Sequence, residues 1–327
     1  MAVNFADEAP DVIKEYLFFM QTIKGRAIKT VDEYYLDLRT FFRFLLQKRR
    51  LVDSEIPFDE ISIISIDVEF LRTVSLMDAF EFMYYLERTR NNSKTSRARK
   101  CSSIKRFFNY LAVKKHYIET DPMRELEIPK IDKTLPKYLT LEQSIELLNA
   151  VDGKFKERDY CILTLFLNCG LRLSELVSLN MNSIRSDNTM VVTGKGSKQR
   201  IIYLNDACIS ALNEWRKVRP NDELKDRDAL FVSSHHKRLS REMVQKTVQK
   251  YLEKIGLDSQ GYSCHKLRHT AATLMYQHGE VDIRVLKDVL GHENLGTTQI
   301  YTHVSDTQRK IASEKNPLSK IKKSENK

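Results

Sequence analysis

The chain has 327 residues, of which 42% are hydrophobic and 30% charged, a balance typical of a globular protein with about two domains. Its 54 Lys and Arg outnumber its 44 Asp and Glu, and the formal net charge of +10 favours nucleic acid as a partner over an acidic membrane surface. The five cysteines lack a Cys-x-x-Cys spacing, the N-terminus is acidic, and no apolar stretch approaches the ~18 residues that span a bilayer. We therefore expect a cytoplasmic protein without disulfides or membrane insertion.

Apolar residues at helical spacing predict four helices in the first part of the chain, over residues 11–24, 30–46, 76–88 and 95–115. Residues 51–75 are less regular and predict a loop, the apolar run ISIISI and a short helix. Prolines and mixed charge disfavour a helix over residues 126–139, which predicts an extended linker. The first domain is thus expected to be a helical bundle over residues 1–125.

In the second part, Thr140 predicts the N-cap of a helix, with Glu142 and Gln143 in its first turn. Residues 189–204 hold two β-branched or aliphatic runs around a Gly-Lys-Gly turn, which predicts a β-hairpin. Further helices are expected over residues 157–168, 174–179, 206–217, 240–255, 265–278, 282–290 and 297–315. The expected fold is mainly α with a small β-sheet: a helical domain, a mixed α/β domain over residues 140–316, and a basic tail over 317–327.

A single-sign charge run lies in the last helix of the first domain. Between Arg88 and Lys115 there are ten basic residues and no acidic one. A solvated face is the ordinary alternative, but such faces usually mix charges of both signs. We therefore expect contacts with a phosphate backbone, made here by Arg97, Arg99, Lys100, Lys105 and Arg106 and in the hairpin by Lys198 and Arg200.

Metal and nucleotide cofactors are not expected. His265 and His269 are four residues apart on one helix face, as zinc ligands can be, but no Glu follows His265 in a His-Glu-x-x-His pattern and no Cys pair supports a closed site. The sequence GKGSK lacks the spacing of a nucleotide-binding phosphate loop. No metal site and no cofactor are therefore predicted.

Phosphodiester chemistry fits the remaining polar residues better. Two guanidinium groups can hold the non-bridging oxygens of a phosphodiester, Lys or His can transfer protons, and Tyr can attack as a nucleophile. Each candidate alone also has an ordinary structural explanation, such as a turn-capping Arg or a core Tyr. The candidates are Arg172, Lys195, His265, Arg268, His292 and Tyr301.

As an ordered set, these residues resemble the tyrosine recombinase (phage integrase) family, and within it the bacterial Xer recombinases. GLRLSEL, TGKGSKQR, HKLRHTAAT and LGHENLGTTQIYTH are similar to the family's active-site boxes. TSRARKCSSIKRFFNYL is similar to its core-binding helix, and LPKYLT to the segment that leads into its catalytic domain. The resemblance covers nearly the whole chain, although the 51–75 segment is long for the family. It implies a SAM-like helical core-binding domain followed by a tyrosine-recombinase catalytic domain.

The resemblance implies roles for individual residues. Tyr301 would attack the scissile phosphate and form a 3′-phosphotyrosyl link, which releases a 5′-hydroxyl. Arg172 and Arg268 would stabilise the transition state, and Lys195 would protonate the leaving 5′-oxygen. The energy of the broken bond stays in the phosphotyrosine, so the resemblance implies chemistry without ATP or metal.

Three further residues complete the implied site. His265 would assist proton transfer with the nucleophile, His292 would hydrogen-bond a phosphate oxygen, and Glu175 would orient the other groups.

The implied partners are double-stranded DNA and other protomers in a homo- or hetero-tetramer on two DNA sites, with a second recombinase or an activating division protein as further candidates. The implied task is the resolution of chromosome dimers at cell division. Three alternatives stay open at this point: an integrase of a phage or transposon, a type IB topoisomerase, and a non-catalytic DNA-binding protein.

Overall fold

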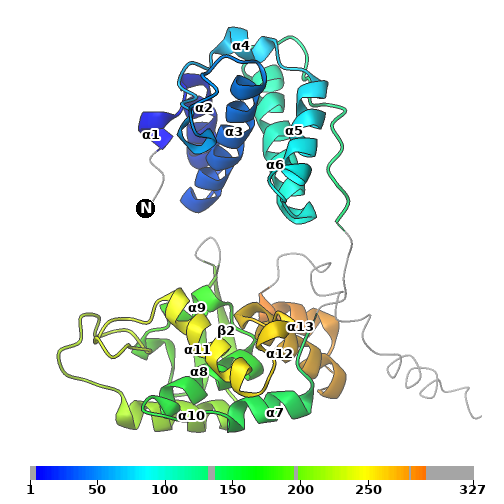
Figure 1. Ribbon diagram of the computed structural model, residues 1–327. Coiled ribbons are helices and arrows are strands. Elements are labelled where there is room, and N and C mark those ends of the chain that lie inside the picture. Colours follow the sequence, from blue (N-terminus) through cyan, green and yellow to red (C-terminus); the bar gives the residue numbers. More distant parts are fainter. Residues whose placement is uncertain (1–4, 132–136, 195–197, 280, 292–327) are drawn as a thin grey trace, which may run out of the picture. The chain divides into compact units, whose positions relative to one another are not determined.

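The computed structural model describes residues 5–131, 137–194, 198–279 and 281–291, and the chain divides into two compact units, residues 1–133 and 134–327 (Figure 1). Lys195, His292, Tyr301, the helix expected over 297–315 and the tail 317–327 lie outside the described residues. Mainly helical units with one small sheet confirm the predicted fold class. No helix within the described ranges is both long and apolar enough to cross a membrane.

The first unit is a helical bundle in which α3, α5 and α6 pack against one another (Figure 1). Its helices are α1 (Phe5–Glu8), α2 (Asp11–Phe18), α3 (Ile28–Lys48), α4 (Val68–Arg72), α5 (Leu76–Arg88) and α6 (Lys94–Asn109). The four predicted helices are confirmed, and α4 is the short helix expected within 51–75. The last turn of two of them is π-helical, because α2 and α6 continue as the wider turns η1 (Phe19–Ile23) and η3 (Tyr110–Lys114), which reach the predicted ends to within one residue. The single turn η2 (Phe58–Glu60) is a 3₁₀ helix.

Aromatic rings fill the core of this unit. Phe41 lies edge-on to Phe82 with ring centroids 5.1 Å apart, and Phe42 lies edge-on to Phe107 at 5.9 Å. Such edge-to-face pairs contribute about 1 kcal/mol each beyond the area they bury. The core therefore joins α3, α5 and α6 through a continuous set of ring contacts.

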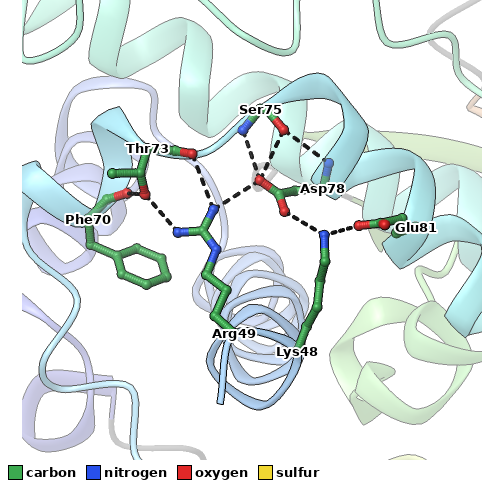
Figure 2. Close-up of polar contacts among 7 residues, drawn as sticks. All are labelled: Lys48, Arg49, Phe70, Thr73, Ser75, Asp78 and Glu81. Atoms are coloured by element: carbon green, nitrogen blue, oxygen red, sulfur yellow. Dashed lines mark hydrogen bonds and ion pairs between the residues drawn. The ribbon is translucent and has the colours of Figure 1, made fainter. Parts of the chain in front are cut away.

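The C-terminal end of α3 is joined to the start of α5 by a polar cluster around Asp78, which Figure 2 shows. The Asp78 carboxylate accepts hydrogen bonds from the backbone N–H of Ser75 at 3.0 Å, from Lys48 Nζ at 2.9 Å and from Arg49 Nη2 at 2.9 Å. The Ser75 hydroxyl accepts in turn from the Asp78 backbone N–H and completes a capping box. Asp78 thus caps α5 and also pairs with two cations at the C-terminal end of α3.

The second unit is built around α8 (Lys156–Cys169), which packs against α10 (Asp206–Val218) and α12 (Cys264–His278) and is buried along most of its length. Its other helices are α7 (Leu141–Asn149), α9 (Leu173–Ser178), α11 (Arg241–Lys254) and α13 (Ile283–Leu290), with short 3₁₀ turns η4 (Met181–Ser183) and η6 (Asp258–Gln260). Strands β1 (Thr189–Thr193) and β2 (Gln199–Tyr203) pair antiparallel, with Val191 opposite Ile201, and confirm the predicted hairpin. The N-cap at Thr140 is also confirmed, as a capping box with Gln143.

The predicted linker, residues 126–139, is bounded by two buried leucines. Leu126 packs in the core of the first unit, and Leu139 packs in the core of the second. The backbone N–H of Leu139 also donates to the Thr270 hydroxyl of α12 at 2.9 Å. The chain is therefore anchored to the second unit one residue before its first helix is capped.

The Asp78 cluster yields a stability prediction. Burial alone would raise the pKa of Asp78. The hydrogen bonds from Ser75 and Lys48 and the charge of Arg49 outweigh burial and lower this pKa below its ordinary value. A carboxylate with a lowered folded pKa stabilises the fold above its unfolded pKa, and this contribution is lost as the pH falls through the folded pKa. Asp78→Asn should lower the free energy of unfolding at neutral pH by about 2 kcal/mol. The loss should shrink below about pH 5, as urea unfolding across pH will measure.

Glu81→Gln provides the control. Glu81 also pairs with Lys48, but it is half exposed, so its removal should change stability by less than about 1 kcal/mol. Equal losses in the two variants, or a loss in Asp78→Asn that does not change with pH, would contradict the assignment.

Candidate active site

Glu175 lies at the centre of the candidate site, in the first turn of α9, with only 1% of its side chain exposed. Its Oε2 accepts the backbone N–H of Arg172 at 2.8 Å, and its Oε1 accepts from Arg172 Nη1 at 2.7 Å. Glu175 therefore caps its own helix and fixes the arginine side chain three residues earlier. The sequence predicts that Glu175 orients other groups of the site, and these two bonds to Arg172 are consistent with that role.

A second arginine reaches the same carboxylate from β2. Arg200 donates from Nη1 to Glu175 Oε1 at 2.7 Å and from Nη2 to Oε2 at 2.9 Å, which is a bidentate pair. Arg268 Nη1 of α12 lies 3.7 Å from Oε2. Burial would raise the pKa of Glu175, but the Arg200 and Arg172 bonds outweigh it and lower the pKa below its usual range. One ionised carboxylate thus orders three guanidinium groups.

Backbone carbonyls hold the other ends of the two predicted catalytic arginines. Arg268 donates to Gly170 O and to Leu290 O, both at 2.6 Å, and Arg172 Nη2 donates to Gly291 O at 2.8 Å. Gly170 ends α8 and Gly291 ends α13, each with a positive φ, of 59° and 65°. The structure therefore brings the side chains of Arg172 and Arg268 together, bound to carbonyls at the C-terminal ends of α8 and α13. Arg172 exposes 35% of its side chain and Arg268 only 2%.

His265 lies in the first turn of α12, one turn before Arg268. Desolvation and the positive charges of Arg268, Lys266 and Arg172 lower the pKa of His265. Its ring is therefore neutral at physiological pH and able to accept a proton. The ring lies edge-on to that of His269 at 4.5 Å, and no group of three or more His, Cys, Asp or Glu side chains forms a metal site in the described ranges.

The described neighbours of Lys195 and His292 reach the arginine cluster. A Cβ placed on Gly194, which precedes Lys195, would lie 3.6 Å from Glu175 Oε1 and 3.8 Å from Arg172 Nη1. Gly291, which precedes His292, is the residue whose carbonyl accepts from Arg172. The positions of Lys195, His292 and Tyr301 in the site stay predictions, because these residues lie outside the described ranges.

Several residues predicted to contact DNA from α6 have partners within the first unit. Lys100 is nearly buried and donates to Asp37 at 3.0 Å, and Arg99 donates to the same carboxylate at 2.7 Å. Asp37 is fully buried in the middle of α3. Arg97 pairs with Glu87 at 2.5 Å. For Lys100, the structure supplies an internal function that the charge run does not predict.

The other end of α6 lines a basic hollow of about 520 Å³ together with η1 and η3. Lys105 donates to the carbonyls of Arg124 and Leu126, and Arg106 donates to the hydroxyl of Tyr34. The hollow contains six basic side chains and one acidic one, which makes it strongly electropositive. The six are Lys24, Arg26, Lys105, Arg106, Lys114 and Arg124.

Sequence reasoning assigned Arg200 to DNA and missed its pairing with Glu175. The sequence of the strand indicated that Arg200 faces inward, because side chains alternate between the two faces of a strand. Ile202 is buried, and Arg200 lies on the same face, whereas Gln199, Ile201 and Tyr203 are exposed. Lys198, by contrast, is exposed at the start of the hairpin's return strand.

A comparison with known protein families now defines the class. The model of the phage integrase family matches residues 137–308, which is more than half of the chain. The chain belongs to this family of tyrosine recombinases, and it is an enzyme that cleaves and rejoins DNA in site-specific recombination.

Within the family, the similarity is to Xer recombinases. The chain is 50% identical to tyrosine recombinase XerC of Caldanaerobacter subterraneus subsp. tengcongensis, over 95% of this chain and 88% of that protein. It is 31% identical to tyrosine recombinase XerD of Proteus mirabilis, over 94% and 93% of the two chains. Among solved structures, the XerH site-specific recombinase bound to its palindromic difH substrate shares the fold, with a TM-score of 0.69 at 22% identity over 92% of this chain and 83% of that chain.

Proposed function

We propose that this recombinase acts as a Xer-type enzyme in the cytoplasm, where it resolves chromosome dimers as a homo- or hetero-tetramer on two double-stranded DNA sites. The 50% identity to a XerC protein over nearly the full chain supports this role over that of a mobile-element integrase. A second recombinase or an activating division protein completes the assembly if the enzyme alone does not recombine two sites.

The observation that carries the proposed chemistry is the pair of arginines ordered by Glu175. Arg172 is the more exposed guanidinium and contacts the scissile phosphate directly in this mechanism. Arg268 takes the same role once DNA binding exposes it, since its side chain is buried in the unbound chain. The Arg172 guanidinium is fixed before DNA arrives, so little reorganisation of this group accompanies the development of charge in the transition state.

The remaining roles follow from the family pattern. Tyr301 attacks phosphorus and forms the 3′-phosphotyrosyl bond while the 5′-oxygen leaves, and Lys195 supplies the proton to that oxygen. The ring of His265 accepts the tyrosine proton, and its lowered pKa keeps the ring unprotonated before the reaction. His292 donates to a non-bridging oxygen. Rejoining reverses these steps with a 5′-hydroxyl of the partner strand.

Tyr301→Phe tests the nucleophile. The variant should bind a nicked suicide duplex as tightly as the wild type, because only one hydroxyl is lost. It should form no covalent protein–DNA product on a denaturing gel. A persisting adduct would show that another side chain attacks the phosphate.

Lys195→Ala tests the general acid. Cleavage should slow by about 10²- to 10⁴-fold, because the 5′-oxygen then leaves without a proton. A substrate with a 5′-thiolate leaving group needs no proton donor and should restore the rate in single-turnover cleavage. Slow cleavage of the thiolate substrate by Lys195→Ala would rule this role out.

DNA contacts in the first unit are proposed for the basic hollow, which includes Lys105 and Arg106. Arg106→Gln should weaken DNA binding and reduce the slope of log Kd against log salt by about 0.9, the effect of one phosphate contact. Lys100→Gln should instead lower the free energy of unfolding, because it leaves Asp37 with one partner fewer, and leave the salt slope unchanged. Fluorescence anisotropy between low and high salt measures both slopes. A reduced slope in Lys100→Gln alone would reverse the two assignments.

A further inference from the structure

Arg200 directs all three nitrogens of its guanidinium group into the protein. Nη1 and Nη2 donate to the two oxygens of Glu175, and Nε donates to the carbonyl of Val289 at 2.9 Å. Only 14% of the side chain is exposed. All three nitrogens therefore have acceptors within the fold, and Arg200 offers less exposed surface to DNA than Arg172, of whose side chain 35% is exposed.

The stem of Arg200 also packs closely on the backbone after α13. A Cβ placed on Gly291 would lie 3.0 Å from Arg200 Cδ and 3.1 Å from Nη1. These distances are too short for a side chain, so Arg200 packs directly against the backbone at this position. Gly291 also presents its carbonyl to Arg172. Arg200 therefore holds the backbone of residues 289–291 by a hydrogen bond to Val289 and by packing against Gly291.

The charges explain why this support reaches Arg172. Glu175 is buried and ionised, and it needs cationic partners on both oxygens. Arg200 bonds to both oxygens, whereas the Arg172 side chain bonds to Oε1 alone. Without Arg200, the carboxylate would bind the Arg172 guanidinium more strongly and hold it away from a phosphate.

We propose that Arg200 is a positioning residue for DNA cleavage. It holds the β2 strand, Glu175 and the backbone of residues 289–291 in fixed relative positions and so sets the orientation of Arg172. The proposal rests on the function proposed above for Arg172. It assigns Arg200 no contact with DNA. Lys195 precedes β2 and His292 follows Gly291 in the sequence, so the two segments that Arg200 joins are those that continue into both predicted catalytic residues.

The test compares full-length Arg200→Met and Arg200→Lys with the wild type on a nicked suicide duplex. Both variants should keep the Kd for DNA within about twofold and leave the salt slope unchanged. Their single-turnover cleavage rates at saturating DNA should fall by about 10- to 100-fold, as is typical when a group that orients a catalytic residue is lost. Arg227→Met, an exposed arginine of the same unit, is the matched control and should match the wild type in both measurements.

A second substitution separates positioning from general damage to the fold. Glu175→Gln combined with Arg200→Met removes the carboxylate charge that would otherwise hold Arg172, so the double variant should cleave faster than Arg200→Met alone. If Arg200→Met does not fold, Arg200→Lys, which retains the charge, provides the same comparison of rate with affinity.

Two results would overturn the proposal. A salt slope reduced by about 0.9 with an unchanged rate at saturation would make Arg200 a phosphate contact. Wild-type cleavage in both single variants would leave it without a role in the reaction. Failure of the proposed function is recognised separately, because the wild type would then form no covalent product on the suicide duplex whatever the Arg200 variants do.

Discussion

The active-site geometry depends on one buried negative charge, the carboxylate of Glu175. Removing an ion from water costs several kcal/mol unless partners of opposite charge surround it. Arg172 and Arg200 supply these partners at 2.7–2.9 Å, and Arg268 adds its charge at 3.7 Å. Three cations around one anion leave a net positive site, which is the condition for binding a phosphodiester. Because the anion is fixed by the first turn of α9, the cations are fixed as well.

The first unit uses the same physical arrangement for a different purpose. Asp37 is fully buried in α3 and gathers Arg99, Lys100 and the Ser103 hydroxyl from α6. Here the cluster holds α3 and α6 together, and Lys100 is nearly buried against Asp37. The sequence of one helix therefore does not show whether a basic residue on it is paired with an acidic side chain of another helix, as Lys100 is with Asp37.

This distinction explains which features were predictable from the sequence. Helices and caps follow from local patterns, so the α5 boundaries and the N-cap at Thr140 were predicted correctly. The motif around Arg172 and Arg268 also carried enough order to identify the family. The π-helical ends of α2 and α6 have no distinct residue pattern, and the partners of Lys100 and Arg200 lie 63 and 25 residues away along the chain. Such pairings are decided by packing between elements, and only the alternation of faces along β2 hinted at one of them.

The hydrogen bond from the Leu139 backbone to Thr270 ties the start of the second unit's first helix to α12. Thr270 lies two residues after Arg268 and five after His265 on the same helix, and its side chain is the acceptor for the last residue before the Thr140 cap. The chain therefore enters the second unit bonded to α12, the helix that carries Arg268 and His265. The entry of the chain and the placement of these two predicted catalytic side chains thus depend on the same helix.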